Sequence, residues 1–201
     1  KKDRVLSFVP LNEDAVQAAE GHTYKDWNIE DAVKDLYRIM EEKAYLTDDR
    51  KTVLISVENK NPTRVNQLQS QLSTCIRKTA EESKRTVHIV TQEKKKDGAL
   101  DQTALNYHIS SGKLQFIRMM TAAYPDLDEM TLSRMSMEEL YRIIFEREKE
   151  KPVWLQMDEE DWNEYKEEMR KAKYGDRDSS DDIDDDDFDD DDFDDDDFDD
   201  D

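Results

Sequence analysis

The sequence predicts an α/β fold in the order β-α-α-β-α-β, followed by an all-α helical region and a disordered acidic tail. Short β-prone apolar runs lie at residues 5–9, 53–57 and 87–90. Between them, apolar residues recur every three or four positions, which is the pattern of amphipathic helices. Two strand–helix–strand passages favour right-handed crossovers. We therefore expect a small, mainly parallel sheet with helices packed on it.

The first predicted strand covers residues 5–9 and ends at Pro10, because proline cannot donate a hydrogen bond to a neighbouring strand. Asn12 has the side chain of a helix N-cap, two acidic residues follow it, and Gly21 is the expected stop. A second helix is predicted over residues 28–45 from its apolar spacing.

The second predicted strand, residues 53–57, is an almost continuous apolar run, which is typical of a strand buried on both faces. Asn61-Pro62 begins a long helix over residues 63–83, with proline near its first position. Cys75 lies on the apolar stripe of this helix, which favours a packed thiol over a reactive one. Residues 87–90 form the third predicted strand.

Beyond residue 92 the pattern is purely helical. One short helix is expected over residues 100–109, and Ser111 can cap another that stops at Pro125. Ser136 and Glu139 have the spacing of a capping box, and Asp158 can cap a last amphipathic helix. The predicted parts are an α/β domain over 1–92, a linker over 93–99, a small helical bundle over 100–150, an amphipathic helix over 151–174 and a disordered tail over 175–201.

The net charge of −22 belongs mainly to the tail. Residues 176–201 hold 19 Asp and one Arg, which is −18 of the total, and residues 1–175 carry the remaining −4. The phenylalanines at 188, 193 and 198 are five residues apart, so neither a helix nor a strand places them on one face. Repulsion between neighbouring aspartates opposes any compact state, which predicts disorder. The body has no basic stripe, which argues against nucleic-acid binding.

The motifs of common enzymes are absent from the sequence. It contains no G-x-S-x-G, phosphate-binding loop, G-x-G-x-x-G or H-E-x-x-H. His22, His88 and His108 lie in three different segments without metal-ligand spacing. We therefore expect no metal, no other cofactor and no catalytic residue. No apolar run approaches the roughly 18–20 residues that span a bilayer.

The stretch Val5-Leu6-Ser7-Phe8-Val9-Pro10-Leu11-Asn12-Glu13-Asp14-Ala15 resembles the extracytoplasmic region of RsgI-type anti-sigma factors, which are single-pass membrane proteins of Gram-positive bacteria. The helix ending in Lys43-Ala44-Tyr45-Leu46, the strand at 53–57 and the long helix before the 86–90 strand also match. The resemblance covers residues 4–92 and extends over 100–147.

This resemblance implies a function in transmembrane signalling. In the family, a cytoplasmic domain holds an alternative sigma factor, and a membrane helix joins it to the outer region. The outer domain breaks its own chain at an Asn-Pro bond before its first strand, and a signal that separates the fragments triggers regulated intramembrane proteolysis. The cytoplasmic domain, the membrane helix and the strand with the Asn-Pro bond are all expected upstream of Lys1. Asn61-Pro62 is the only Asn-Pro in this sequence, and it is interpreted as an ordinary start of the long helix.

A partner strand missing from the chain would leave an open sheet edge, and we expect the N-terminal strand fragment of the same precursor to bind there by strand addition. The expected pairing edge is Val5, Leu6, Ser7, Phe8 and Val9. The expected function is the outer sensing part of a membrane-bound anti-sigma factor, on the extracytoplasmic face, with an unknown extracellular ligand. The sigma factor is expected to bind only through the missing cytoplasmic domain. The alternative is an intracellular acidic-tail protein that competes for basic partners.

Overall fold

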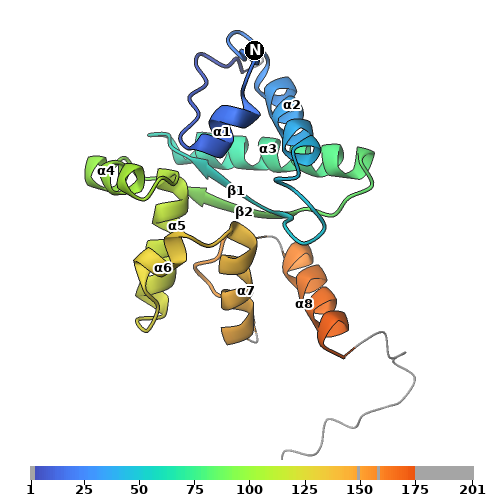
Figure 1. Cartoon of the computed structure of the whole chain (residues 1–201), viewed down its shortest axis with the longest axis vertical. Coiled ribbons are helices and arrows are strands. Elements are labelled where there is room, and N and C mark those ends of the chain that lie inside the picture. The colour runs from blue at the N-terminus through green and yellow to red at the C-terminus, as the bar shows by residue number, and fades with distance from the viewer. Residues whose placement is uncertain (1–2, 149, 158, 175–201) are drawn as a thin grey trace, which may run out of the picture. The chain divides into compact units, whose positions relative to one another are not determined.

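A parallel pair of strands crosses the middle of the fold, with helices on both of its faces (Figure 1). This computed structural model describes residues 3–148, 150–157 and 159–174. The elements are α1 (Glu13–Ala18), α2 (Ile29–Glu42), β1 (Thr52–Val57), α3 (Pro62–Glu82), β2 (His88–Glu93), α4 (Gly98–Asn106), α5 (Ser111–Ala123), α6 (Glu129–Ser133), α7 (Met137–Arg147) and α8 (Glu159–Tyr174).

The chain divides into two units, residues 1–166 and residues 167–201, with the boundary inside α8. Within the second unit, Arg170 donates to the carboxylate of Glu167 at 2.8 Å along the helix. The packing described below belongs to the first unit. No helix among the described residues is both long enough and apolar enough to cross a membrane.

The sheet is the product of one β-α-β passage. β1 and β2 run parallel, with Thr52 opposite His88 and Val57 opposite Glu93. α3 joins them and packs on both strands. The predicted parallel pairing of these two strands is therefore confirmed.

One face of the sheet holds an apolar core. Alternate residues of a strand point to the same face, so Ile55 and Val57 of β1 lie on the side of Ile89 from β2. They pack against α2 and α3 through Tyr37, Val65, Ile76 and Ala80, all less than 9 % exposed. At roughly 25 cal/mol per Å² of buried apolar surface, this cluster is a main source of the domain's stability.

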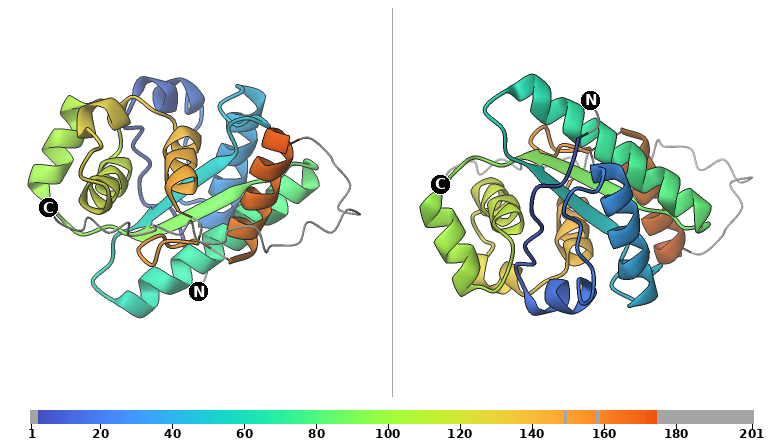
Figure 2. Two further views of the ribbon diagram at one scale, coloured as in Figure 1. Left: turned by 90° about the horizontal axis from the view of Figure 1, so that it is seen from below. Right: turned by 90° about the horizontal axis from the view of Figure 1, so that it is seen from above.

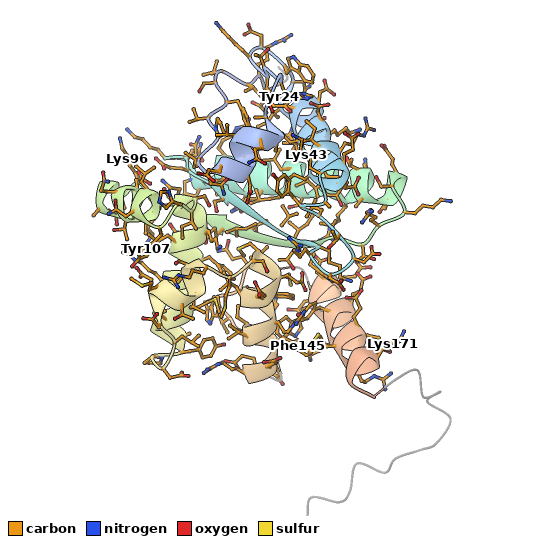
Figure 3. All side chains as sticks on the ribbon, in the orientation of Figure 1. Tyr24, Lys43, Lys96, Tyr107, Phe145 and Lys171 are labelled. Atoms are coloured by element: carbon orange, nitrogen blue, oxygen red, sulfur yellow. The ribbon has the colours of Figure 1, made fainter. Side chains whose placement is uncertain are left out.

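On the opposite face, polar residues lie on both sides of the central pair Leu54 and Val90, and the helical region covers this face. Gln92 of β2 donates to the carbonyl oxygen of Gly112 in α5 at 2.6 Å, and Thr52 of β1 donates to the carboxylate of Glu138 in α7. His88 is fully buried against the ring of Tyr165 in α8, with centroids 5.3 Å apart. In both views of Figure 2, α7 lies beside the strands. The helical region therefore shares the sheet with α2 and α3.

The strand predicted over residues 5–9 does not form, so the described sheet has two strands and not three. Arg4 makes a single bridge with Asn28, and Val5 exchanges two backbone hydrogen bonds with residues 26 and 27, each 2.9 Å long. Residues 5–9 form no strand because the segment opposite them, residues 26–28, is a turn and a helix cap before α2. It offers no extended backbone beyond this bridge. Residues 6–9 are therefore outside the regular sheet.

Helix starts follow the predicted caps closely. Asn12, Asn28 and Asn61 each accept from backbone N–H groups of the first turn, and Pro62 opens α3. Ser136 and Glu139 form the predicted capping box of α7. α5 is capped by Ser110, one residue before the predicted Ser111, because its side chain reaches the N–H of Lys113.

Other boundaries differ from the sequence predictions. α1 ends at Ala18, before Gly21, and α4 already begins at Gly98 because Asp97 caps it. The five-residue α6 was not predicted, since so short a helix shows no clear periodicity. The predicted Asp158 cap and the tail over 175–201 lie outside the described residues.

Candidate functional site

Among the described residues, none pairs with β1 on the side away from β2. The carbonyl oxygen of Lys51 accepts from the N–H of His88 at 3.0 Å, and that of Val57 accepts from the N–H of Lys94 at 2.8 Å. Backbone N–H and C=O groups alternate in direction along a strand, so those of the odd-numbered residues of β1 point toward β2. The residues whose N–H and C=O groups point outward are Thr52, Leu54 and Ser56.

The outer edge of β2, by contrast, is covered. The N–H of Thr91 donates to the carbonyl oxygen of Gln156 at 2.8 Å, and Val90 forms an isolated bridge with Met157. The N–H of Ile89 donates to the buried carboxylate of Asp161 at 3.3 Å. An extended segment and a carboxylate thus occupy the positions of a third strand on this side, and the open edge of the described sheet is that of β1.

A cavity of about 800 Å³ lies along the open edge. Its floor is formed by Thr52, Leu54 and Ser56, the residues with outward-pointing backbone groups. Its walls come from the segment just before α1, from α2 and α4, from the start of α5 and from the first residue of α7. Unpaired strand groups beside a cavity of this size are suited to a further extended segment of backbone.

Gly112 brings the start of α5 against the strand. A Cβ atom at this position would lie 2.3 Å from Oγ of Ser56 and 2.8 Å from its Cβ, so only glycine allows this approach. The side chain of Gln92 bonds both to Oγ of Ser56 at 2.7 Å and to the Gly112 carbonyl. These contacts fix the wall of the cavity relative to its floor.

The charged groups at the cavity are already paired within the protein. Lys94 lies 2.8 Å from the carboxylate of Glu58 and 3.2 Å from that of Asp101. Hydrogen bonds from the Ser111 hydroxyl and from Lys94 hold the pKa of Asp101 below its usual value. Burial lowers the pKa of Lys113, whose ammonium donates to the carbonyl oxygens of residues 133 and 135. The cavity therefore offers little charge to a ligand.

The segment predicted to pair, Val5–Val9, is largely exposed. Leu6 is 84 % exposed and Val9 66 % exposed, while Phe8 packs edge-on against Tyr24 with ring centroids 5.0 Å apart. These residues do not line the cavity, although Leu11, two residues beyond Val9, does. Pairing at residues 5–9 stays a prediction.

Sequence reasoning missed the outer edge of β1. The run at 53–57 was predicted to be buried on both faces, which says nothing about its two edges. Thr52 and Ser56, which alternate with apolar neighbours, are a signal of polar contacts on one face of the strand and not of its open edge. Thr52 donates to Glu138 of α7, and Ser56 accepts from Gln92, which also donates to Gly112 of α5, so this face carries the helical region.

The other residues singled out in the sequence have structural surroundings. Cys75 is 6 % exposed and its thiol donates to the carbonyl oxygen of Glu30 at 3.5 Å. Burial raises its pKa, which makes the thiolate less available, as expected of a packed thiol. His22 lies 3.1 Å from the carboxylate of Asp35. Over the described ranges, no cluster of three or more His, Cys, Asp or Glu side chains could hold a metal ion.

Comparison with known proteins identifies a family for this chain. A family described as the anti-sigma factor RsgI-like central domain matches residues 1–119, more than half of the chain. The match runs from the N-terminal segment through β1, α3 and β2 into α5, and so includes the open edge and most of the cavity walls. No curated protein matches the chain. The chain therefore belongs to the anti-sigma factor RsgI-like central domain family.

Proposed function

We propose that this chain is the outer, signal-transmitting part of a membrane-bound RsgI-like anti-sigma factor, and that it works by holding or releasing a partner strand. The observation that carries the proposal is the open edge of β1 beside a cavity, in a chain of this family. The partner is the N-terminal strand fragment of the same precursor. Anti-sigma factors act by binding, and the proposal assigns no catalytic step to the described residues.

The remaining parts of the mechanism lie outside this chain. A cytoplasmic domain upstream of the membrane helix holds the alternative sigma factor, and the outer region described here lies on the extracytoplasmic face. An extracellular ligand acts on the outer region. When the partner strand leaves the domain, the membrane-bound stub becomes a substrate for regulated proteolysis.

Strand addition can be tested directly with a peptide. The probe is a synthetic peptide of the segment encoded immediately before Lys1. Because the bound strand stabilises only the folded state, the peptide at about 100 times its Kd should add roughly 2.7 kcal/mol and raise Tm by several degrees. A scrambled peptide is the control. An unchanged melting temperature, or a β1-paired dimer in sedimentation that the peptide does not dissociate, would contradict the proposal.

A variant pair locates the binding edge. Leu54→Pro removes an outward N–H and leaves the inward bonds of β1 to β2 in place, since proline is tolerated on the open side of an edge strand. Leu54→Ala shortens the same side chain but keeps the N–H. We expect peptide binding to survive in Leu54→Ala and to be lost in Leu54→Pro, with titration calorimetry as the readout and circular dichroism as the folding check. Equal binding by both variants would place the peptide elsewhere.

A further inference from the structure

The cavity beside β1 has apolar walls on both faces of the sheet. Resting on the proposed function, we infer that the segment received at this edge is apolar on both of its own faces. An ordinary edge strand differs, because one face meets water and its residues alternate between apolar and polar. The predicted partner instead has a continuous apolar run, like Val53-Leu54-Ile55 of β1.

On the face that carries α2 and α3, the cavity is lined by Met40 and Val53. Both are partly buried and pack against the apolar core around Ile55 and Tyr37. A strand added to β1 continues its pleat, so every second side chain of that strand enters this region. An apolar side chain there extends the existing core.

On the face that carries α5 and α7, the cavity is lined by Leu54, Ile109 and Met137. Ile109 leads into α5 and is 8 % exposed, while Met137 is the first residue of α7. The side chains that alternate with the first set enter this second region. Both sets therefore meet apolar side chains, beside the polar lining residues Ser110, Ser111 and Lys113 at the start of α5.

The charges around the cavity support an uncharged partner. Lys94 is paired with Glu58 and Asp101, and the ammonium of Lys113 is bonded to two backbone carbonyl oxygens. A charged side chain entering at the centre would lose its water and find no free opposite charge, and burial of an unpaired charge is strongly unfavourable. Charge is acceptable only at the ends of the strand, where solvent is reached.

The length of β1, which forms the floor of the cavity, sets the length of the partner segment. β1 has six residues, which at about 3.3 Å per residue make an edge of roughly 20 Å. Three outward residues offer three N–H and three C=O groups. A partner of five or six extended residues can bond to all of them.

A lysine scan of the partner peptide tests this inference. The probe is again the synthetic peptide of the segment encoded immediately before Lys1, with lysine placed in turn at five successive central positions. We expect every one of the five substitutions to raise Kd at least tenfold, so that no tolerated position lies between two that lose binding. A lysine added beyond the last paired residue is the control and should change Kd less than twofold. Titration calorimetry with the intact chain gives all values, so no protein variant is required.

Two results separate this inference from the proposed function. If the parent peptide binds and the losses alternate with a period of two, the partner is an ordinary one-sided edge strand and the inference is overturned while the proposed function stands. If the parent peptide does not bind, both fall. Losses at adjacent positions support both.

Discussion

At the scale of single residues, Gly112 controls how closely α5 approaches β1. Its missing side chain leaves room for Ser56, whose Oγ and Cβ lie where a Cβ of residue 112 would be. Gly98, at the start of α4, has open space at the same position and serves as a comparison.

We expect Gly112→Ala to lower the free energy of unfolding by about 1–3 kcal/mol, because Ser56 belongs to a strand and cannot move away without disturbing the sheet. Gly98→Ala should be neutral or stabilising by up to about 1 kcal/mol, since it only restricts the unfolded chain. Urea unfolding of the two variants measures the difference. Equal effects would show that α5 can shift outward without loss.

At the scale of elements, the helix starts were predictable because their chemistry is local. A cap requires a side chain and a backbone N–H two or three residues away, as at Asn12, Asn28 and Asn61. Strands depend on distant partners, so the apolar run at 5–9 predicted a strand that finds only a turn at residues 26–28. The open edge of β1 was not predictable for the same reason.

The capping box of α7 gives a test at this scale. The N–H of Ser136 donates to the Glu139 carboxylate at 2.6 Å, and its hydroxyl donates to the same carboxylate at 2.8 Å. These two bonds hold the pKa of Glu139 below its usual value. We expect Ser136→Ala to cost about 1 kcal/mol of stability at pH 7.

The effect of this variant should depend on pH. A carboxylate with a lowered folded-state pKa stabilises the fold above its unfolded pKa of about 4.3, and the contribution is lost as the pH falls through the folded pKa. The stability difference between the wild type and Ser136→Ala should therefore shrink between pH 5 and pH 3. Denaturant titrations at several pH values measure it, with Ser70→Ala on the exposed side of α3 as the control. A difference that is constant with pH would exclude a contribution from the bond between the Ser136 hydroxyl and the Glu139 carboxylate.

At the scale of the whole molecule, the helical region and the α/β part share one sheet. The polar positions Thr52 and Gln92 bond to Glu138 of α7 and Gly112 of α5. The sequence predicted a linker between these parts at residues 93–99, because the apolar pattern becomes purely helical there. Such a pattern does not show which face of the sheet the helices pack on. The polar residues Thr52 and Ser56 in the otherwise apolar β1 were the sign that the second face had its own cover.

Because the two parts share the sheet, we expect residues 3–166 to unfold in a single transition. Two single-tryptophan variants report on it, one retaining Trp27 before α2 and one retaining Trp162, which is 1 % exposed in α8. Both should give the same midpoint in denaturant as the far-ultraviolet circular dichroism signal. Two separate midpoints would instead indicate that the part around Trp27 unfolds independently of α7 and α8, which pack together through Trp162.

The two edges of the sheet also set a limit on self-association. A sheet grows into a fibre only when both edges accept new strands. Here the outer edge of β2 is occupied by Gln156 and by the carboxylate of Asp161, so one strand added at β1 ends the growth. Pairing of two copies through their sheet edges would therefore use β1 of each and give a closed two-fold pair. Under the proposed function, release of the partner strand would expose an edge that pairs once and does not seed polymerisation.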